Sequence, residues 1–165
     1  AERAVSNAVV AIDSEKQLEV SDVAEEKNRR TLEGRIDDAA ELWRSRSELA
    51  RAAFLNNIDA DDPASLQFDV LMTAMNLRVE DAITTFANTI EERGTSSPED
   101  GARLMHELTG AVVLTYDEMD RTLSKDCRGK SGDDFELFNF IDPDVGRPLL
   151  RVEGLIEDRK RAPLF

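Results

Sequence analysis

The sequence predicts an all-α protein: an antiparallel bundle of three long helices, with a short N-terminal helix and a short C-terminal helix that follows an irregular segment. Three observations favour this class. Apolar residues recur at three- and four-residue steps over most of the chain, which is the spacing of one helical face. Proline and glycine fall between these periodic stretches, where helices begin and end. The 165 residues, 41% of them hydrophobic, suffice for one closed core.

We therefore expect residues 1–165 to form a single helical domain. Residues 1–129 are predicted to make the bundle. Residues 130–165 are predicted to contribute an irregular aromatic segment, the short last helix and an apolar tail. The changes of pattern near Gly129 and Asp142 are interpreted as loops within this domain, because apolar patterning resumes after each of them.

The stretch from Leu66 to Ile90 is the most regular pattern and is predicted to be the central helix. Asp62 followed by Pro63 predicts its start, and Gly94 predicts its end. Its apolar face comprises Phe68, Leu71, Met72, Met75, Val79, Ala82, Ile83, Phe86 and Ile90. Three further residues widen that face and predict neighbours on more than one flank, namely Leu66, Val70 and Leu77.

Two helices are predicted before the central one. Residues 2–19 begin with an apolar pattern at helical spacing and are interpreted as a short amphipathic helix. A longer helix is expected from Asp22 to Asn56, with Gly34 inside it marking a bend or a close helix contact. The predicted apolar stripe of this longer helix is Leu32, Ile36, Ala39, Trp43, Ala50, Ala53 and Phe54.

The pattern after the central helix predicts a third long helix and then a change of character. Ser97 and Pro98, followed by two acids, predict its start, and Gly129 its end. Its predicted stripe is Met105, Leu108, Val112, Thr115, Met119 and Leu123. A last helix is expected from about Pro148 to Lys160, with Leu149, Val152, Leu155 and Ile156 on its apolar side.

The charge balance limits the classes of partner. The net charge of −14 argues against general binding to nucleic acid and permits a protein partner with a basic surface. The apolar runs are too short to span a bilayer. A single cysteine, Cys127, excludes an internal disulfide and fits a reducing compartment, although the compartment and self-association both stay open.

No group of residues carries a catalytic or metal-binding signature, so we expect neither an enzyme nor a cofactor. His106 has no second histidine to share a metal, and Cys127 has no adjacent base. Residues 129–131 resemble the end of a phosphate loop but lack its first glycine. Asp142 to Glu153 has the outline of a calcium loop, but Arg147 stands where that loop needs glycine, which favours a turn and helix cap.

Two features are more typical of recognition. An aromatic segment between acids and an apolar chain end could each contact a partner. The candidate partner-binding residues are Phe135, Leu137, Phe138, Phe140, Ile141, Leu164 and Phe165. The alternative for the aromatic segment is that it closes the end of the core, and the alternative for the tail is disorder. Trp43 and Phe54 are expected in the core, with an exposed interface anchor as the alternative.

These observations favour a non-enzymatic protein–protein interaction module, such as an accessory or assembly subunit of a larger complex. On this interpretation, deletion of residues 133–165 abolishes partner binding and leaves the helices intact. One alternative is an extracytoplasmic four-helix sensor domain that binds a small ligand between its helices. Another is an acidic inhibitor that imitates nucleic acid, although arginines interleave with the acids of the helix from Asp22.

Overall fold

A computed structural model describes residues 16–17, 23, 31–123 and 135–155. Three α-helices, α2 (Leu32–Asn57), α3 (Asp62–Arg93) and α4 (Pro98–Thr122), are followed by two 3-10 helices, η1 (Leu137–Phe140) and η2 (Pro143–Val152). No strand occurs within these ranges, which confirms the all-α class for the described part of the chain. Of the helix expected over residues 2–19, only residues 16–17 are described, and these two are helical; the apolar tail lies outside the described residues.

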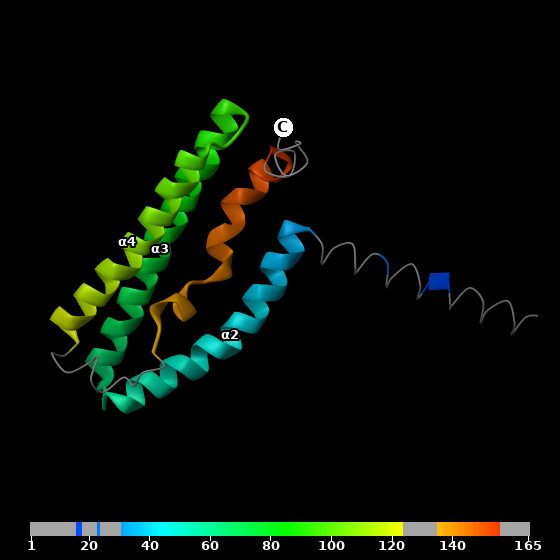
Figure 1. The fold of residues 1–165 in the computed structure, drawn as a ribbon. Coiled ribbons are helices and arrows are strands. Elements are labelled where there is room, and N and C mark those ends of the chain that lie inside the picture. The colour runs from blue at the N-terminus through cyan, green and yellow to red at the C-terminus, as the bar shows by residue number, and fades with distance from the viewer. Residues whose placement is uncertain (1–15, 18–22, 24–30, 124–134, 156–165) are drawn as a thin grey trace, which may run out of the picture.

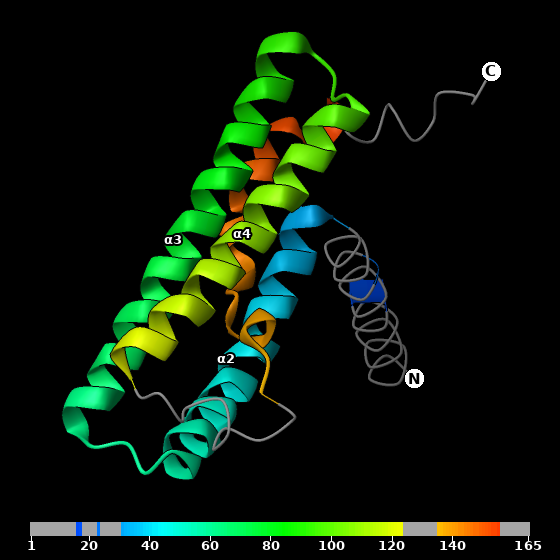
Figure 2. The same cartoon turned by 60° about the vertical axis from the view of Figure 1, so that its left-hand side comes forward.

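The helices are arranged as a hairpin with a third helix that diverges from it (Figure 1). α3 and α4 lie side by side along their length, joined by a short turn. α2 meets α3 near residues 58–61, and η1 and η2 then run between α2 and the hairpin, as Figures 1 and 2 both show. η2 contacts both α2 and α3 closely. The C-terminal segment, residues 135–155, thus lies between α2 and α3. In a plain three-helix bundle these two helices would pack directly against each other.

The central helix forms where the sequence predicts it. The carboxylate of Asp61 accepts a hydrogen bond from the amide of Ala64 at 2.9 Å, so the cap lies one residue before the expected one. Gly94 ends the helix at φ +74°, a left-handed conformation that favours glycine, and its amide donates to the Ile90 carbonyl. The predicted apolar face is buried apart from Phe86, which is partly buried, and Ala87 joins it.

The helix has neighbours on more than one flank, as expected, because α3 packs against both α4 and η2. The three residues from which this was predicted do not make those contacts: Leu66, Val70 and Leu77 are 66%, 53% and 62% exposed. Their spacing places all three on one side of the helix, opposite the buried residues of its core face. Such exposed apolar side chains at helical spacing are a feature of interaction surfaces.

α2 begins ten residues later than predicted. Thr31 has extended backbone angles and its hydroxyl oxygen accepts from the Gly34 amide at 3.0 Å, so Gly34 lies in the first turn of the helix instead of near its middle. The carboxylate of Glu153 accepts from the Leu32 amide, which ties this end to the C-terminal segment. The buried stripe contains Ala40 and Leu55, whereas the expected Ala39 and Ala53 are exposed.

α4 starts with a reciprocal cap. The amide of Asp100 donates to the Ser97 hydroxyl oxygen, while the Asp100 carboxylate accepts from the Ser97 amide at 2.9 Å and from its hydroxyl at 2.8 Å. Arg93, in the last turn of α3, donates to the same carboxylate. Farther along, Met105 is exposed, contrary to its predicted place in the stripe, because Leu104 and Leu108 face the core there.

Replacing Asp100 by asparagine is expected to destabilise the protein near neutral pH. Hydrogen bonds from Ser97, first from its amide and then from its hydroxyl, and the charge of Arg93 lower the pKa of Asp100. The unfolded chain therefore binds this proton at a higher pH than the folded chain. The stabilisation is present above about pH 4 and is lost as the pH falls through the folded pKa.

Urea unfolding of both proteins across that range measures this effect. The difference between them should be largest near neutral pH and should shrink in acid. An Asp81→Asn variant provides the control, because Asp81 is exposed in the middle of α3. A difference between the Asp100 variant and the native protein that stays constant with pH would contradict the assignment.

The last helix differs from its prediction in kind and extent. It is a 3-10 helix that begins at Pro143, with the Asp142 carboxylate accepting from the Asp144 amide at 2.9 Å. Pro148 lies inside it, has no N–H to donate and would disrupt an α-helix. Val145 and Val152 are buried against α3, so this segment forms part of the core. An α-helical turn starts only at Glu153.

Candidate functional site

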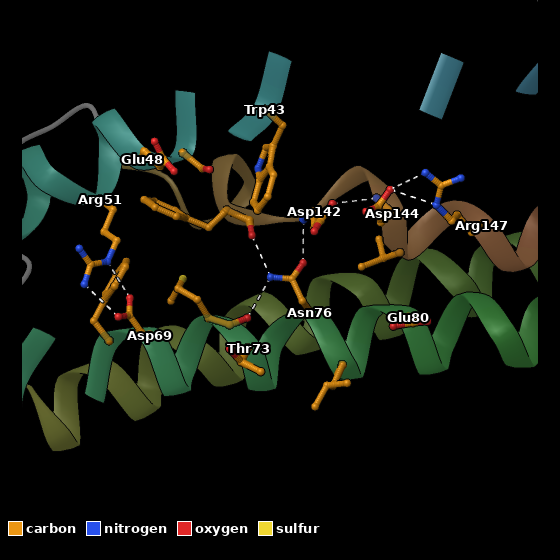
Figure 3. A pocket seen from close by; sticks show the side chains of 16 residues that line it. Trp43, Glu48, Arg51, Asp69, Thr73, Asn76, Glu80, Asp142, Asp144 and Arg147 are labelled. Carbon is orange, nitrogen blue, oxygen red and sulfur yellow. Dashed lines mark hydrogen bonds and ion pairs between the residues drawn. The ribbon is translucent and has the colours of Figure 1, made fainter. Parts of the chain in front are cut away.

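A groove of about 690 Å³ lies between α2 and α3, with the C-terminal segment as its floor (Figure 3). α2 contributes Trp43, Ser47, Glu48 and Arg51 to its lining. α3 contributes Phe68, Asp69, Met72, Thr73, Asn76, Leu77 and Glu80. The C-terminal segment contributes Phe140, Asp142, Asp144, Val145 and Arg147. The groove exists because η1 and η2 separate the two helices while leaving one side of the separation open.

Two side chains from opposite walls hold the floor in place. The indole Nε1 of Trp43 donates to the Asn139 carbonyl at 2.9 Å. On the other wall, Nδ2 of Asn76 donates to the Phe140 carbonyl at 2.9 Å, and its Oδ1 accepts from the Asp142 amide at 2.7 Å (Figure 3). These bonds satisfy backbone groups that an irregular segment cannot pair with itself. The floor is therefore fixed from both sides.

A cluster of four aromatic rings lies under one end of the groove. Phe54 stacks on Phe135 with ring centroids 4.3 Å apart, and Phe68 meets Phe140 edge to face at 5.4 Å. Phe54, Phe68 and Phe140 are buried. The Tyr116 hydroxyl of α4 accepts from the Leu137 amide at 3.1 Å and positions the start of η1 above this cluster. The apolar base of the groove is thus a rigid part of the core.

Both arginines of the groove are engaged in ion pairs. Arg51 makes two hydrogen bonds to Asp69, at 2.7 and 2.9 Å, which join the two walls near one end. Arg147 donates to Asp37 at 2.7 Å and to Asp144 at 2.9 Å. Hydrogen bonding to these carboxylates raises the pKa of both arginines above the ordinary value, so both stay charged.

The remaining carboxylates leave the groove acidic. Five acidic residues line it against two arginines, both already paired. Glu48 on the α2 wall and Glu80 on the α3 wall are exposed and have no ion pair among the described residues. Asp142 uses one oxygen to cap η2. Negative charge therefore stands on both rims, above an apolar base.

The structure separates the candidate partner-binding residues into groups. Leu137 and Phe140 are 0% and 5% exposed, and Phe135 and Ile141 are partly buried against the same core. Phe138 is 57% exposed and points away from that core. Leu164 and Phe165 lie outside the described residues. That these residues contact a partner stays a prediction, and Phe138 is the described member most accessible to one.

Deleting residues 133–165 cannot isolate a binding surface in this protein. Four buried side chains of the core, Leu137, Phe140, Val145 and Val152, lie in that stretch. The deletion would also remove the backbone carbonyl of Asn139, to which the indole of Trp43 donates. We therefore expect this deletion to damage the core as well as any binding surface. Point variants on the exposed surface are the better test of partner binding.

The structure describes only some of the residues weighed for chemistry. His106 is exposed on α4, and Cys127 and residues 129–131 lie outside the described residues. In the outlined calcium loop, Asp142 caps η2 and Asp144 binds Arg147. Within the described ranges, no three side chains of the metal-binding types converge. None of the helices described there is long and apolar enough to cross a membrane.

Sequence patterning did not identify the residues that build the groove. Asp69, Thr73, Asn76 and Glu80 repeat opposite the core stripe and resemble an ordinary solvated face. They line the groove only because the C-terminal segment approaches from that side. Of the two residues weighed as core or interface anchor, Phe54 is buried, whereas Trp43 is partly exposed in the groove.

Comparisons of the chain with protein-family models, with curated proteins and with solved structures gave no match.

Proposed function

We propose that this protein is a non-enzymatic protein–protein interaction module, an accessory or assembly subunit, and that a partner segment binds in the groove between α2 and α3. The observation that carries this proposal is the groove itself: an open apolar channel with an aromatic base and a fixed floor. Trp43 is the partly exposed aromatic residue of this depression, and tryptophan in a preformed depression is typical of the residues that dominate binding energy. We also propose that residues 1–165 form one helical domain around the three long helices.

The exposed apolar ridge beside the groove supports the same proposal. Leu77 lines the groove, and Leu66 and Val70 precede it on the same side of α3. A single exposed apolar side chain costs little free energy. A row of them along one helix is typical of a surface that a partner covers. A partner in the groove would cover Leu77 first.

Two exposed leucines offer a matched test. Leu77 is 62% exposed in the groove, and Leu49 is 73% exposed on α2 outside it. Substitution of each by serine removes similar apolar area. We expect Leu77→Ser to weaken partner binding about tenfold, because burying a leucine contributes about 1.5–3 kcal/mol and serine recovers little of it. Leu49→Ser should change the affinity less than about twofold.

The measurement has two stages. Intact protein and both variants are first compared in pull-downs from the native source. A protein retained by the wild type and by Leu49→Ser, but lost with Leu77→Ser, is then purified and titrated against all three by calorimetry. Equal affinity for both variants would exclude the groove as the site. Failure of the wild type to retain any protein would count against the interaction module as a whole.

A second candidate is a module that binds a small ligand between the helices. The groove volume of about 690 Å³ lies within the range of about 300–1,000 Å³ that is usual for ligand pockets. Its lining combines an apolar base with polar groups that could orient a ligand, as such pockets do. An increase in the unfolding temperature of the pure protein with a small molecule, abolished by a bulky substitution at Thr73, would favour this candidate over the first.

A further inference from the structure

Given the interaction module proposed above, we infer that the occupant of the groove is a cationic amphipathic helix of the partner, with apolar residues along one face and lysine or arginine on both flanks. This inference rests on the proposed function and specifies the chemistry of the partner. Three features of the groove carry it, namely its apolar base, the placement of its charges and its length.

The base of the groove selects an apolar face. Met72 and Phe140 lie at the bottom, with Trp43 on one wall and Leu77 on the other. The backbone groups of the floor are already bonded to Trp43 and Asn76, so the floor offers few hydrogen bonds to an extended strand. A helix already pairs its backbone N–H and C=O groups with each other, so it loses the fewest hydrogen bonds when it leaves water for such a groove.

The charges of the groove select cations on both flanks of that helix. Glu48 stands on one wall and Glu80 on the other, and Figure 3 shows them on opposite sides of the opening. The two arginines cannot neutralise them, because both are paired with Asp37, Asp69 and Asp144. Cationic side chains that reach each rim would be complementary to this arrangement, whereas an acidic partner would meet repulsion.

The length of the walls fits a short helix. The α3 wall extends from Phe68 to Glu80, which at 1.5 Å per residue is about 18 Å, or about three turns. Three turns present apolar residues at positions i, i+4, i+7 and i+11 to the base. A cation on either side of this stripe then falls near each rim carboxylate. The groove is therefore matched to about 12 residues of such a helix.

Three synthetic peptides of about 18 residues test this inference, each long enough to form a helix. All carry leucines along one face, and the other positions are lysine in the first, glutamine in the second and glutamate in the third. Trp43 is the single tryptophan of the chain, so its fluorescence reports occupation of the groove by a peptide that contains none. We expect the lysine peptide to bind at least about tenfold more tightly than the glutamine peptide, and the glutamate peptide least.

Matched charge variants of the full chain distinguish binding of the lysine peptide in the groove from its general attraction to an acidic protein. Glu48→Gln with Glu80→Gln removes the rim charge and should weaken the lysine peptide about threefold to tenfold. Glu107→Gln with Asp117→Asn removes the same charge from exposed positions on α4 and should change its affinity less than about twofold. An equal loss in both double variants would overturn the inference, because the attraction would then come from the net charge alone.

The peptide series also separates failure of this inference from failure of the proposed function. Equal binding of all three peptides would overturn the cationic assignment and leave the groove as an apolar binding site. Tighter binding of the glutamate peptide would overturn it outright. If none of the peptides changes the fluorescence of Trp43, the helical occupant is rejected, while the leucine variants described above still decide whether a partner uses the groove.

Discussion

Replacing Phe140 by alanine is expected to lower the free energy of unfolding by about 3–5 kcal/mol. Phe140 is 5% exposed, meets Phe68 edge to face and lies 5.6 Å from the ring of Phe135. Its removal leaves a cavity at the point where the C-terminal segment joins the core, and helices on both sides limit the collapse of that cavity. Since a domain of this size is stable by about 5–15 kcal/mol, the loss is a large share of the total.

Phe138 provides the matched control for this prediction. It lies two residues earlier in the same 3-10 helix and is 57% exposed. Phe138→Ala should change the free energy of unfolding by no more than about 0.5 kcal/mol. Urea titrations followed by circular dichroism would measure both variants, with an unchanged slope showing that the midpoint reflects stability. Similar losses for the two phenylalanines would contradict the placement of this segment.

Replacing Asn76 by alanine is expected to cost about 2–3 kcal/mol, although the change removes little apolar contact. The Asn76 amide pairs with the Phe140 carbonyl and the Asp142 amide, two partly buried backbone groups of the groove floor. Without it both groups lose their partner inside the protein, and each such loss costs about 1–3 kcal/mol where water cannot fully replace it. Thermal and urea unfolding of the variant would measure the cost.

Two further variants test the mechanism of that loss. Asn76→Asp keeps the oxygen that accepts from the Asp142 amide and loses the donor to the Phe140 carbonyl, so its cost should be intermediate. Thr73→Ala, one turn away on the same wall, should be nearly neutral because Thr73 is exposed. If Asn76→Ala were as mild as Thr73→Ala, the floor would not depend on this side chain.

The sequence predicts the helices better than the space between them. The bounds of α3 follow from local signals, namely the acids near Pro63 and the glycine at residue 94. The late start of α2 at Thr31 was missed because Asp22 gives an equally good capping pattern, and the Glu153 carboxylate that binds the Leu32 amide is 121 residues away. Periodicity shows only which face of a helix is apolar. It does not predict contacts between residues that are far apart in the sequence.

The groove was missed for the same reason. Nothing near Asn76 indicates that its amide reaches the backbone of residues 140–142, because the partners lie 64 and 66 residues farther along the chain. The acidic balance permitted a protein partner with a basic surface, but only the structure shows where unpaired carboxylates and an apolar base coincide. Trp43 and Phe140 were the groove residues that the sequence alone marked as possible partner contacts.

The place of the C-terminal segment has a consequence for synthesis on the ribosome. Contacts between α3 and α4 are local in sequence, so this hairpin can form as soon as residue 122 has emerged. α2 precedes this hairpin in the chain, yet most of its packing partners are in η2, and the amide of Leu32 donates to the carboxylate of Glu153. The nascent chain must therefore carry α2 without these contacts until residues 143–153 have been translated, and during that interval the apolar face of α2 is accessible to a chaperone.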